Sequence, residues 1–171
     1  MNKIKLFGIA LLAAIALMGN LQASEQNKQL NMTLWQTMDA LQQQIPLSKQ
    51  GVEAALSTQL FEVDEPSNHL FHFFESPPMA LTEGVVISGL DLRLKRGGGH
   101  PGFLALAIGG ACVTLDQIRA HYEPLKLTDA PHGHSLNEEF VYSQSRPWGE
   151  LSFGFAERNP KCLSSIALRP K

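Results

Sequence analysis

The stretch AIGGACVTLDQIRAHY (residues 107–122) decides the fold, because a strand, a turn and a helix start meet in it. Thr114, with Gln117 three residues later, forms the capping box that starts a helix. Two glycines before Cys112 suit a close turn from the strand into this helix. Three interpretations of the turn are open: a Cys112 thiolate activated by the helix N-terminus, a phosphate-cradling loop, or one half of a disulfide.

Strands are predicted on both sides of this stretch. Leu90, Leu92 and Leu94 alternate with polar residues, as in a half-buried strand. After the turn GGGHPG (97–102), FLALAI (103–108) predicts a partner strand with small residues at alternate positions, which makes a hairpin. Further strands are expected at LFHFFES (70–76), FVYSQS (140–145), WGELSFGFAE (148–157) and CLSSIALRP (162–170), which Cys162 would open.

Two helices are predicted earlier in the chain. Residues 32–46 place apolar side chains at helical spacing up to Pro46, which ends the helix. Ser48 is a good N-cap for a second helix with Val52 and Leu56 on its apolar face. Loops are expected at EVDEPSNH (62–69) and KLTDAPHGHSLNEE (126–139).

The first residues predict export. Lys3 and Lys5 precede a short apolar run, and the small residue Ala23 follows a polar break, as in a secretory signal peptide over 1–23. The run is shorter than the roughly 20 residues of a membrane span, so no stable span is expected after cleavage. We therefore expect a periplasmic protein with a flexible segment at 24–31 and, beyond it, one domain of ordinary length or two very small ones.

Composition and motifs exclude several classes of function. The formal net charge is −2 and the sequence has no cluster of lysine and arginine, so no nucleic-acid partner is expected. Neither glycine-rich segment matches a nucleotide-binding motif. No cofactor and no metal site are predicted, since no H-E-x-x-H occurs and the histidines lack a ligand spacing; they are His69, His72, His100, His121, His132 and His134.

The two cysteines are expected to pair. In an oxidising compartment Cys112 and Cys162 predict a disulfide, which closes a loop of about 50 residues and stabilises by about 4 kcal/mol in the chain-entropy relation. The competing hypothesis is a Cys112 nucleophile with His100, His121 or His134 as its base.

The two halves of the chain share one plan of helix, loop, short aromatic strand and hairpin. Ser48 and Thr114, the two expected N-caps, lie 66 residues apart (114 − 48). The predicted class is α+β: two tandem helix-plus-antiparallel-meander units, at 32–111 and 112–171, which share a core and carry their helices on one face.

The segments CVTLDQIRAHYEPL (112–125), WGELSFGF (148–155) and CLSSIAL (162–168) carry a resemblance. A capped helix followed by an antiparallel hairpin, in tandem units of an exported chain, resembles the β-lactamase inhibitory protein superfamily and small exported immunity-type proteins. The resemblance implies a tandem α/β scaffold that binds another protein. It implies no contact residues by position.

Two segments predict a protein-binding edge. Glu62, Asp64 and Glu65 lie close together, and Tyr142, Arg146 and Trp148 surround a turn. Tyrosine, tryptophan and arginine dominate interface hot spots. The alternative is that Trp148 packs on the core and that the acidic side chains are only solvated.

The function expected from these patterns is non-enzymatic binding of a partner toxin or hydrolase, as an inhibitor or immunity-type protein. One alternative is an envelope thiol enzyme or hydrolase that uses Cys112 with a histidine. The other is an envelope assembly or structural factor.

Overall fold

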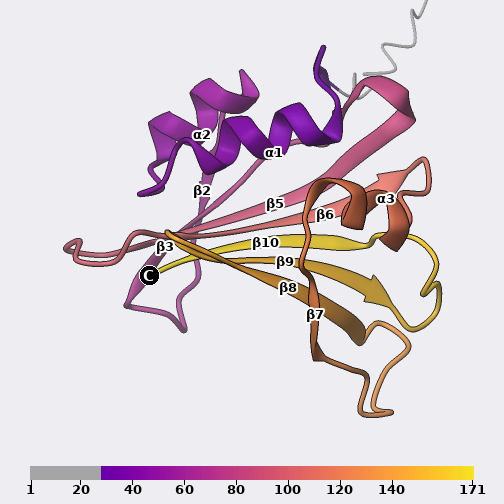
Figure 1. The fold of residues 1–171 in the computed structure, drawn as a ribbon. Coiled ribbons are helices and arrows are strands. Elements are labelled where there is room, and N and C mark those ends of the chain that lie inside the picture. The colour runs from indigo at the N-terminus through magenta and orange to yellow at the C-terminus, as the bar shows by residue number, and fades with distance from the viewer. Residues whose placement is uncertain (1–27) are drawn as a thin grey trace, which may run out of the picture.

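Ten strands of residues 28–171, the part of the chain that the computed structural model describes, pair into one mixed sheet (Figure 1). The predicted signal peptide lies outside the described residues. The strands are β1 (Lys28–Gln29), β2 (Phe61–Val63), β3 (Phe71–Glu75), β4 (Met79–Ala80), β5 (Val85–Lys95), β6 (Phe103–Gly110), β7 (Lys126–Asp129), β8 (Glu139–Arg146), β9 (Gly149–Ala156) and β10 (Ser165–Pro170). The helices are α1 (Leu34–Gln42), α2 (Lys49–Leu56), α3 (Leu115–His121) and a short 3₁₀ turn, η1 (Thr82–Gly84).

The order of strands across the sheet places β10, the last strand in the chain, near the middle. The antiparallel series runs β2-β3-β5-β6-β10-β9-β8-β7, and the short parallel pair β1-β4 extends the first part of β5. The long strand β5 pairs with two strands along the same edge: β4 pairs with Val86 and Ile87, and β3 pairs with residues 91–95.

Local sequence starts each helix where it was expected. In α2 the Ser48 hydroxyl accepts a hydrogen bond from Gly51 N at 3.0 Å, and in α3 the predicted capping box forms between Thr114 and Gln117. The first helix has the same device, a capping box at Thr33. The side-chain caps satisfy backbone N–H groups that have no partner within the helix.

The core lies between the helices and one face of the sheet. Trp35 of α1 stacks on His121 of α3 with ring centroids 3.8 Å apart, and Tyr122 packs 5.1 Å from Phe153 of β9. Cross-strand neighbours Leu106, Ile166 and Phe153 are fully or almost fully buried on this face. The α+β class with helices on one face is therefore confirmed at this level.

Three sequence predictions about the sheet need correction. The strands β2 and β7 lie where loops were expected, because at the sheet edges their residues are exposed on both faces and show no alternation. Residues 28–30, expected to be flexible, form β1 and a hydrogen bond from Leu30 N to Ala80 O of 2.8 Å. Cys162 does not open β10, which begins at Ser165.

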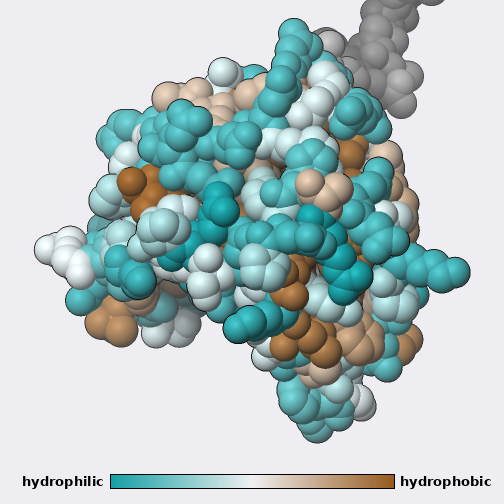
Figure 2. Space-filling view, in the orientation of Figure 1, coloured by the Kyte–Doolittle hydropathy of each residue, from teal (hydrophilic) through white to brown (hydrophobic). Residues whose placement is uncertain are grey.

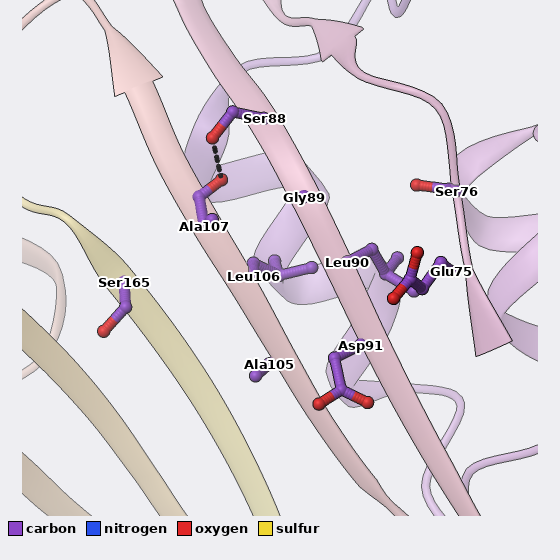
Figure 3. Close-up of a pocket in the computed structure, with 10 residues that line it drawn as sticks. All are labelled: Glu75, Ser76, Ser88, Gly89, Leu90, Asp91, Ala105, Leu106, Ala107 and Ser165. Carbon is purple, nitrogen blue, oxygen red and sulfur yellow. Dashed lines mark hydrogen bonds between the residues drawn. The ribbon is translucent and has the colours of Figure 1, made fainter. Parts of the chain in front are cut away.

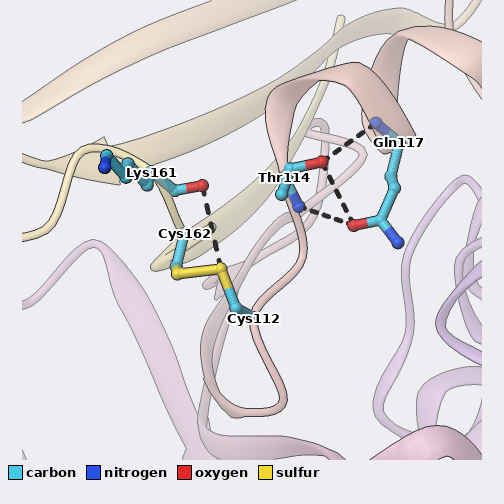
Figure 4. Close-up of a disulfide and its surroundings, with 5 residues drawn as sticks. All are labelled: Cys112, Thr114, Gln117, Lys161 and Cys162. Atoms are coloured by element: carbon cyan, nitrogen blue, oxygen red, sulfur yellow. Dashed lines mark hydrogen bonds between the residues drawn. A yellow bond between two sulfur atoms is a disulfide. The ribbon is translucent and has the colours of Figure 1, made fainter.

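The turn between β6 and α3 is a tight joint closed by the predicted disulfide (Figure 4). Cys112 and Cys162 are bonded, with Cα atoms 5.0 Å apart. Gly110 has a φ of +74° there, and a Cβ on it would overlap the carbonyl oxygen of Gly84. The glycine and the disulfide thus hold the start of α3 against the turn that leads into β10.

Candidate binding face

No helix of residues 28–171 covers the second face of the sheet, because α1, α2 and α3 all pack on the core face. Residues that alternate with the buried ones point to this face, and at its centre they are small: Gly89, Ala105, Ala107, Ser165 and Ala167. We call this surface the open face. Small side chains leave the backbone of the three central strands β5, β6 and β10 within reach of another molecule.

A shallow hollow of about 430 Å³ lies over these small residues (Figure 3). Figure 3 looks onto the open face, with the helices behind the strands. Ala105, Ala107 and Ser165 form part of its floor, and Glu75 and Asp91 belong to its wall. The two carboxylates are direct cross-strand neighbours on β3 and β5. The hollow at the centre of the open face therefore has a floor of small residues and an acidic wall.

Arg93 lies next to this hollow, in one cross-strand row with Phe73 and Phe103. Its guanidinium donates to Asp91 Oδ2 from Nε at 2.8 Å and from Nη2 at 2.5 Å. The hydrogen bond with Asp91 raises the pKa of Arg93, against a smaller opposing effect of burial. The guanidinium carbon also lies 5.3 Å from the ring centroids of both Phe73 and Phe103. Arginine held between aromatic rings is typical of interface hot spots.

The six residues predicted as a binding edge are not brought together. Glu62 lies on β2, with Asp64 and Glu65 in the exposed segment that follows. Tyr142 and Arg146 lie on β8, and six strand spacings of about 4.8 Å separate β2 from β8, roughly 29 Å along the sheet.

The predicted binding residues near the β8–β9 turn, Tyr142, Arg146 and Trp148, pack toward the core. Tyr142 packs edge-on against Phe155, 5.9 Å between centroids, and Trp148 is partly buried against the core. Arg146 donates to the side-chain oxygens of Gln144 at 3.1 Å and Gln42 at 3.2 Å. Arg146 thus connects β8 to α1, and both Tyr142 and Arg146 lie on the side of β8 opposite the open face.

The acidic half is solvent-exposed. Glu62 Oε1 lies 2.6 Å from His72 Nδ1, on the side of β2 and β3 opposite the open face. Asp64 and Glu65 are exposed. The sequence reading missed the open face, although the alternating small residues of FLALAI (103–108) pointed to its floor.

The cysteine and the histidine-containing loop that were considered for catalysis or metal binding make structural contacts. Cys112 offers no thiolate while it is bonded to Cys162. The Glu138 carboxylate accepts backbone N–H bonds from His132, Gly133 and His134 and so holds their loop. Within residues 28–171 no group of three or more histidine, cysteine, aspartate or glutamate side chains is placed to hold a metal ion.

The remaining surface gives no broad apolar patch on the side that Figure 2 shows, where small apolar groups are separated by hydrophilic ones. The large apolar side chains exposed in residues 28–171 are Phe61, Val63, Leu70, Leu127 and Leu136. No helix in the described part of the chain has the length and hydropathy needed to cross a membrane.

Comparison of the chain with protein-family models, with curated proteins and with solved structures finds no match. The functional assignment therefore rests on the geometry of the chain itself.

Proposed function

We propose that this chain is an exported, non-enzymatic protein-binding protein of the inhibitor or immunity type, which holds a partner toxin or hydrolase against its open face. The observation that carries the proposal is a sheet face without helices whose centre is built from small residues and whose end carries Arg93 between two aromatic rings. A partner loop can lie on the small residues, and the arginine and the rings supply anchoring contacts.

The size of the open face supports a protein as its occupant. Six strands, β3 to β8 in sheet order, at about 4.8 Å spacing and about eight residues long, cover roughly 24 Å by 26 Å. That projected area of roughly 600 Å² approaches the roughly 800 Å² that one partner buries in a standard interface. The Cys112–Cys162 disulfide supports export, since such bonds persist in oxidising compartments.

The proposal includes two tandem units, at 32–111 and 112–171, with the scaffold of the β-lactamase inhibitory protein superfamily. Its support is the strand order, in which β2-β3-β5-β6 meets β10-β9-β8-β7 at the β6–β10 pair. Each series follows a helix with a side-chain N-cap, at Ser48 for α2 and Thr114 for α3. A structural comparison of the two units after superposition tests this element of the proposal.

Site-specific photo-crosslinking tests the binding function. A photoreactive phenylalanine is introduced into the full chain in its native cells, at Ser145 of β8, on the rim of the open face, and, as a control, at Ala54 of α2; both positions are exposed. We expect one discrete adduct with another protein at Ser145 and none at Ala54.

Three outcomes contradict the proposal: no adduct at Ser145, equal adducts at both positions, or an adduct of twice the mass of the chain, which indicates self-association. With the partner in hand, Ala107→Trp should weaken binding by a hundredfold or more, whereas Ala54→Trp should leave it unchanged. An assembly factor would instead crosslink to outer-membrane components.

A further inference from the structure

A second hollow, of about 320 Å³, opens at one end of the open face, where β5 and β10 end and β6 begins. Its lining includes Phe71, Arg93, His100, Phe103 and Arg169. No carboxylate side chain contributes to this lining, in contrast to the small-residue hollow beside Glu75 and Asp91. We call it the arginine hollow.

Both arginines keep unused hydrogen-bond donors. Arg93 uses Nε and Nη2 on Asp91, which leaves Nη1 without a partner in the described chain. Arg169 uses Nη1 on Glu150 at 2.9 Å, and its Nε and Nη2 have no partner among residues 28–171. Their side chains are 45% and 52% exposed, so these N–H groups are open to an incoming acceptor.

The histidine adds a donor and the phenylalanines add apolar walls. His100 Nδ1 accepts the Gly102 N–H at 3.1 Å, so the neutral ring carries its proton on Nε2. The His100 ring meets Phe71 edge-on, with centroids 6.1 Å apart, and Phe103 lies beside the Arg93 guanidinium. A ligand here meets N–H donors together with the faces or edges of aromatic rings.

The local charge favours a monoanion over a dianion. Asp91 and Glu150 already form ion pairs with Arg93 and Arg169, so two positive charges face two negative ones before any ligand arrives. A dianion such as phosphate would be poorly compensated, whereas one carboxylate can use the remaining donors. The two phenylalanines favour a carboxylate that has hydrocarbon next to it.

We propose that the arginine hollow binds a carboxylate side chain that stands beside an apolar residue on a loop of the partner protein. This inference rests on the proposed function, because the open face must hold that partner for the carboxylate to reach the hollow. The bound group is an aspartate or glutamate of the partner, held by Arg169 and Arg93 and flanked by Phe71 and Phe103.

Binding of small probes to the ¹⁵N-labelled, disulfide-bonded chain tests the inference without the partner. The probes are the acetylated and amidated tetrapeptide Ala-Phe-Glu-Ala, its Gln counterpart, 3-phenylpropionate, 3-phenylpropanamide and inorganic phosphate. We expect saturable amide shifts at Gly102 and Phe103 with the Glu peptide and with 3-phenylpropionate, at dissociation constants of about 1–10 mM. The amide compounds and phosphate should bind at least fivefold more weakly.

Arginine variants locate the effect. Arg169→Gln should weaken the binding of both carboxylate probes at least fivefold, because it removes a charged hydrogen-bond donor from the hollow. Arg93→Lys keeps the charge and loses the planar fork, and we expect a threefold or greater loss. The matched control Arg158→Gln changes the same charge on the turn after β9, away from the hollow, and should change binding less than twofold.

Several results would overturn the inference. They are the absence of saturable shifts with both carboxylate probes, equal binding of acid and amide, tighter binding of phosphate, or the same loss in Arg158→Gln as in Arg169→Gln. Binding of 3-phenylpropionate without the Glu peptide would assign the hollow to a free organic acid and refute the partner side chain. Failure here leaves the crosslink at Ser145 intact, so the two proposals fail separately.

Discussion

A single methyl group added at Gly154 of β9 should destabilise the protein through a carboxylate beside it. The Glu139 carboxylate of β8 accepts hydrogen bonds from the hydroxyl groups of Ser164 and Ser165, with an oxygen–oxygen distance of 2.6 Å in each. A Cβ at position 154 would lie 2.6 Å from Glu139 Cδ and closer still to its Oε2 and to Ser165 Oγ. Gly154→Ala therefore forces the carboxylate away from both hydroxyl groups.

The cost follows from the two hydrogen bonds. A hydrogen bond to a charged group contributes about 1.5–3 kcal/mol, and both bonds here are only partly buried, so we expect a loss of about 3 kcal/mol in the free energy of unfolding. For a domain of this size that corresponds to about 6–12 °C in Tm. A Cβ at Gly109 of β6 would meet no heavy atom within 4 Å, so Gly109→Ala should cost less than about 1 kcal/mol and serves as the control.

Urea unfolding followed by circular dichroism measures both variants and a double-mutant cycle with Glu139→Ala. When Glu139 is already alanine, Gly154→Ala has no carboxylate to displace, so the cycle should show a coupling of about 2 kcal/mol. Equal stability of Gly154→Ala and Gly109→Ala, or a coupling near zero, would refute the reasoning.

Three further predictions concern the disulfide and the α1–α3 contact. The double variant Cys112→Ala/Cys162→Ala should lose about 4 kcal/mol in the free energy of unfolding measured with urea, because the disulfide closes a loop over a separation of 50 residues. Reduction of the parent chain with dithiothreitol should cause the same loss. Equal stability with and without the disulfide would contradict this prediction. Burial raises the pKa of Tyr122 to about 12. The free energy of unfolding should therefore fall as the pH rises from 10 to 12, and the phenolate absorbance of Tyr122 should appear only as the pH approaches 12. An absorbance titration that is the same in Tyr122→Phe as in the parent chain would contradict this prediction. In a double-mutant cycle, Trp35→Ala and His121→Ala should show a coupling of about 1 kcal/mol in the free energy of unfolding, because the two rings stack. Additive effects of the two substitutions would contradict this prediction.

Features encoded by neighbouring residues could be predicted from the sequence. The caps at Ser48 and Thr114 need only residues within three positions, and the β5–β6 hairpin needs only alternation and its glycine turn. Edge strands were missed because β2 and β7 have no buried side.

Features that depend on strand order could not be predicted in this way. The arginine hollow joins Arg93 of β5 to Arg169 of β10, and their proximity follows from β10 pairing with β6. Tyr142 and Arg146 have the composition of a binding edge, but only the register with β9 shows that Tyr142 lies opposite the buried Phe153. Local patterns leave the choice of face and neighbour undetermined.

The position of β10 between β6 and β9 sets an order of events during synthesis. A ribosome releases the chain from its N-terminal end, so β6 and β9 each keep one unpaired edge until residues 165–170 emerge. Arg169 arrives with the same strand, and the floor of small residues closes at that moment. The open face is thus complete only when β10, which is encoded after all the other strands of the sheet, has paired with both β6 and β9.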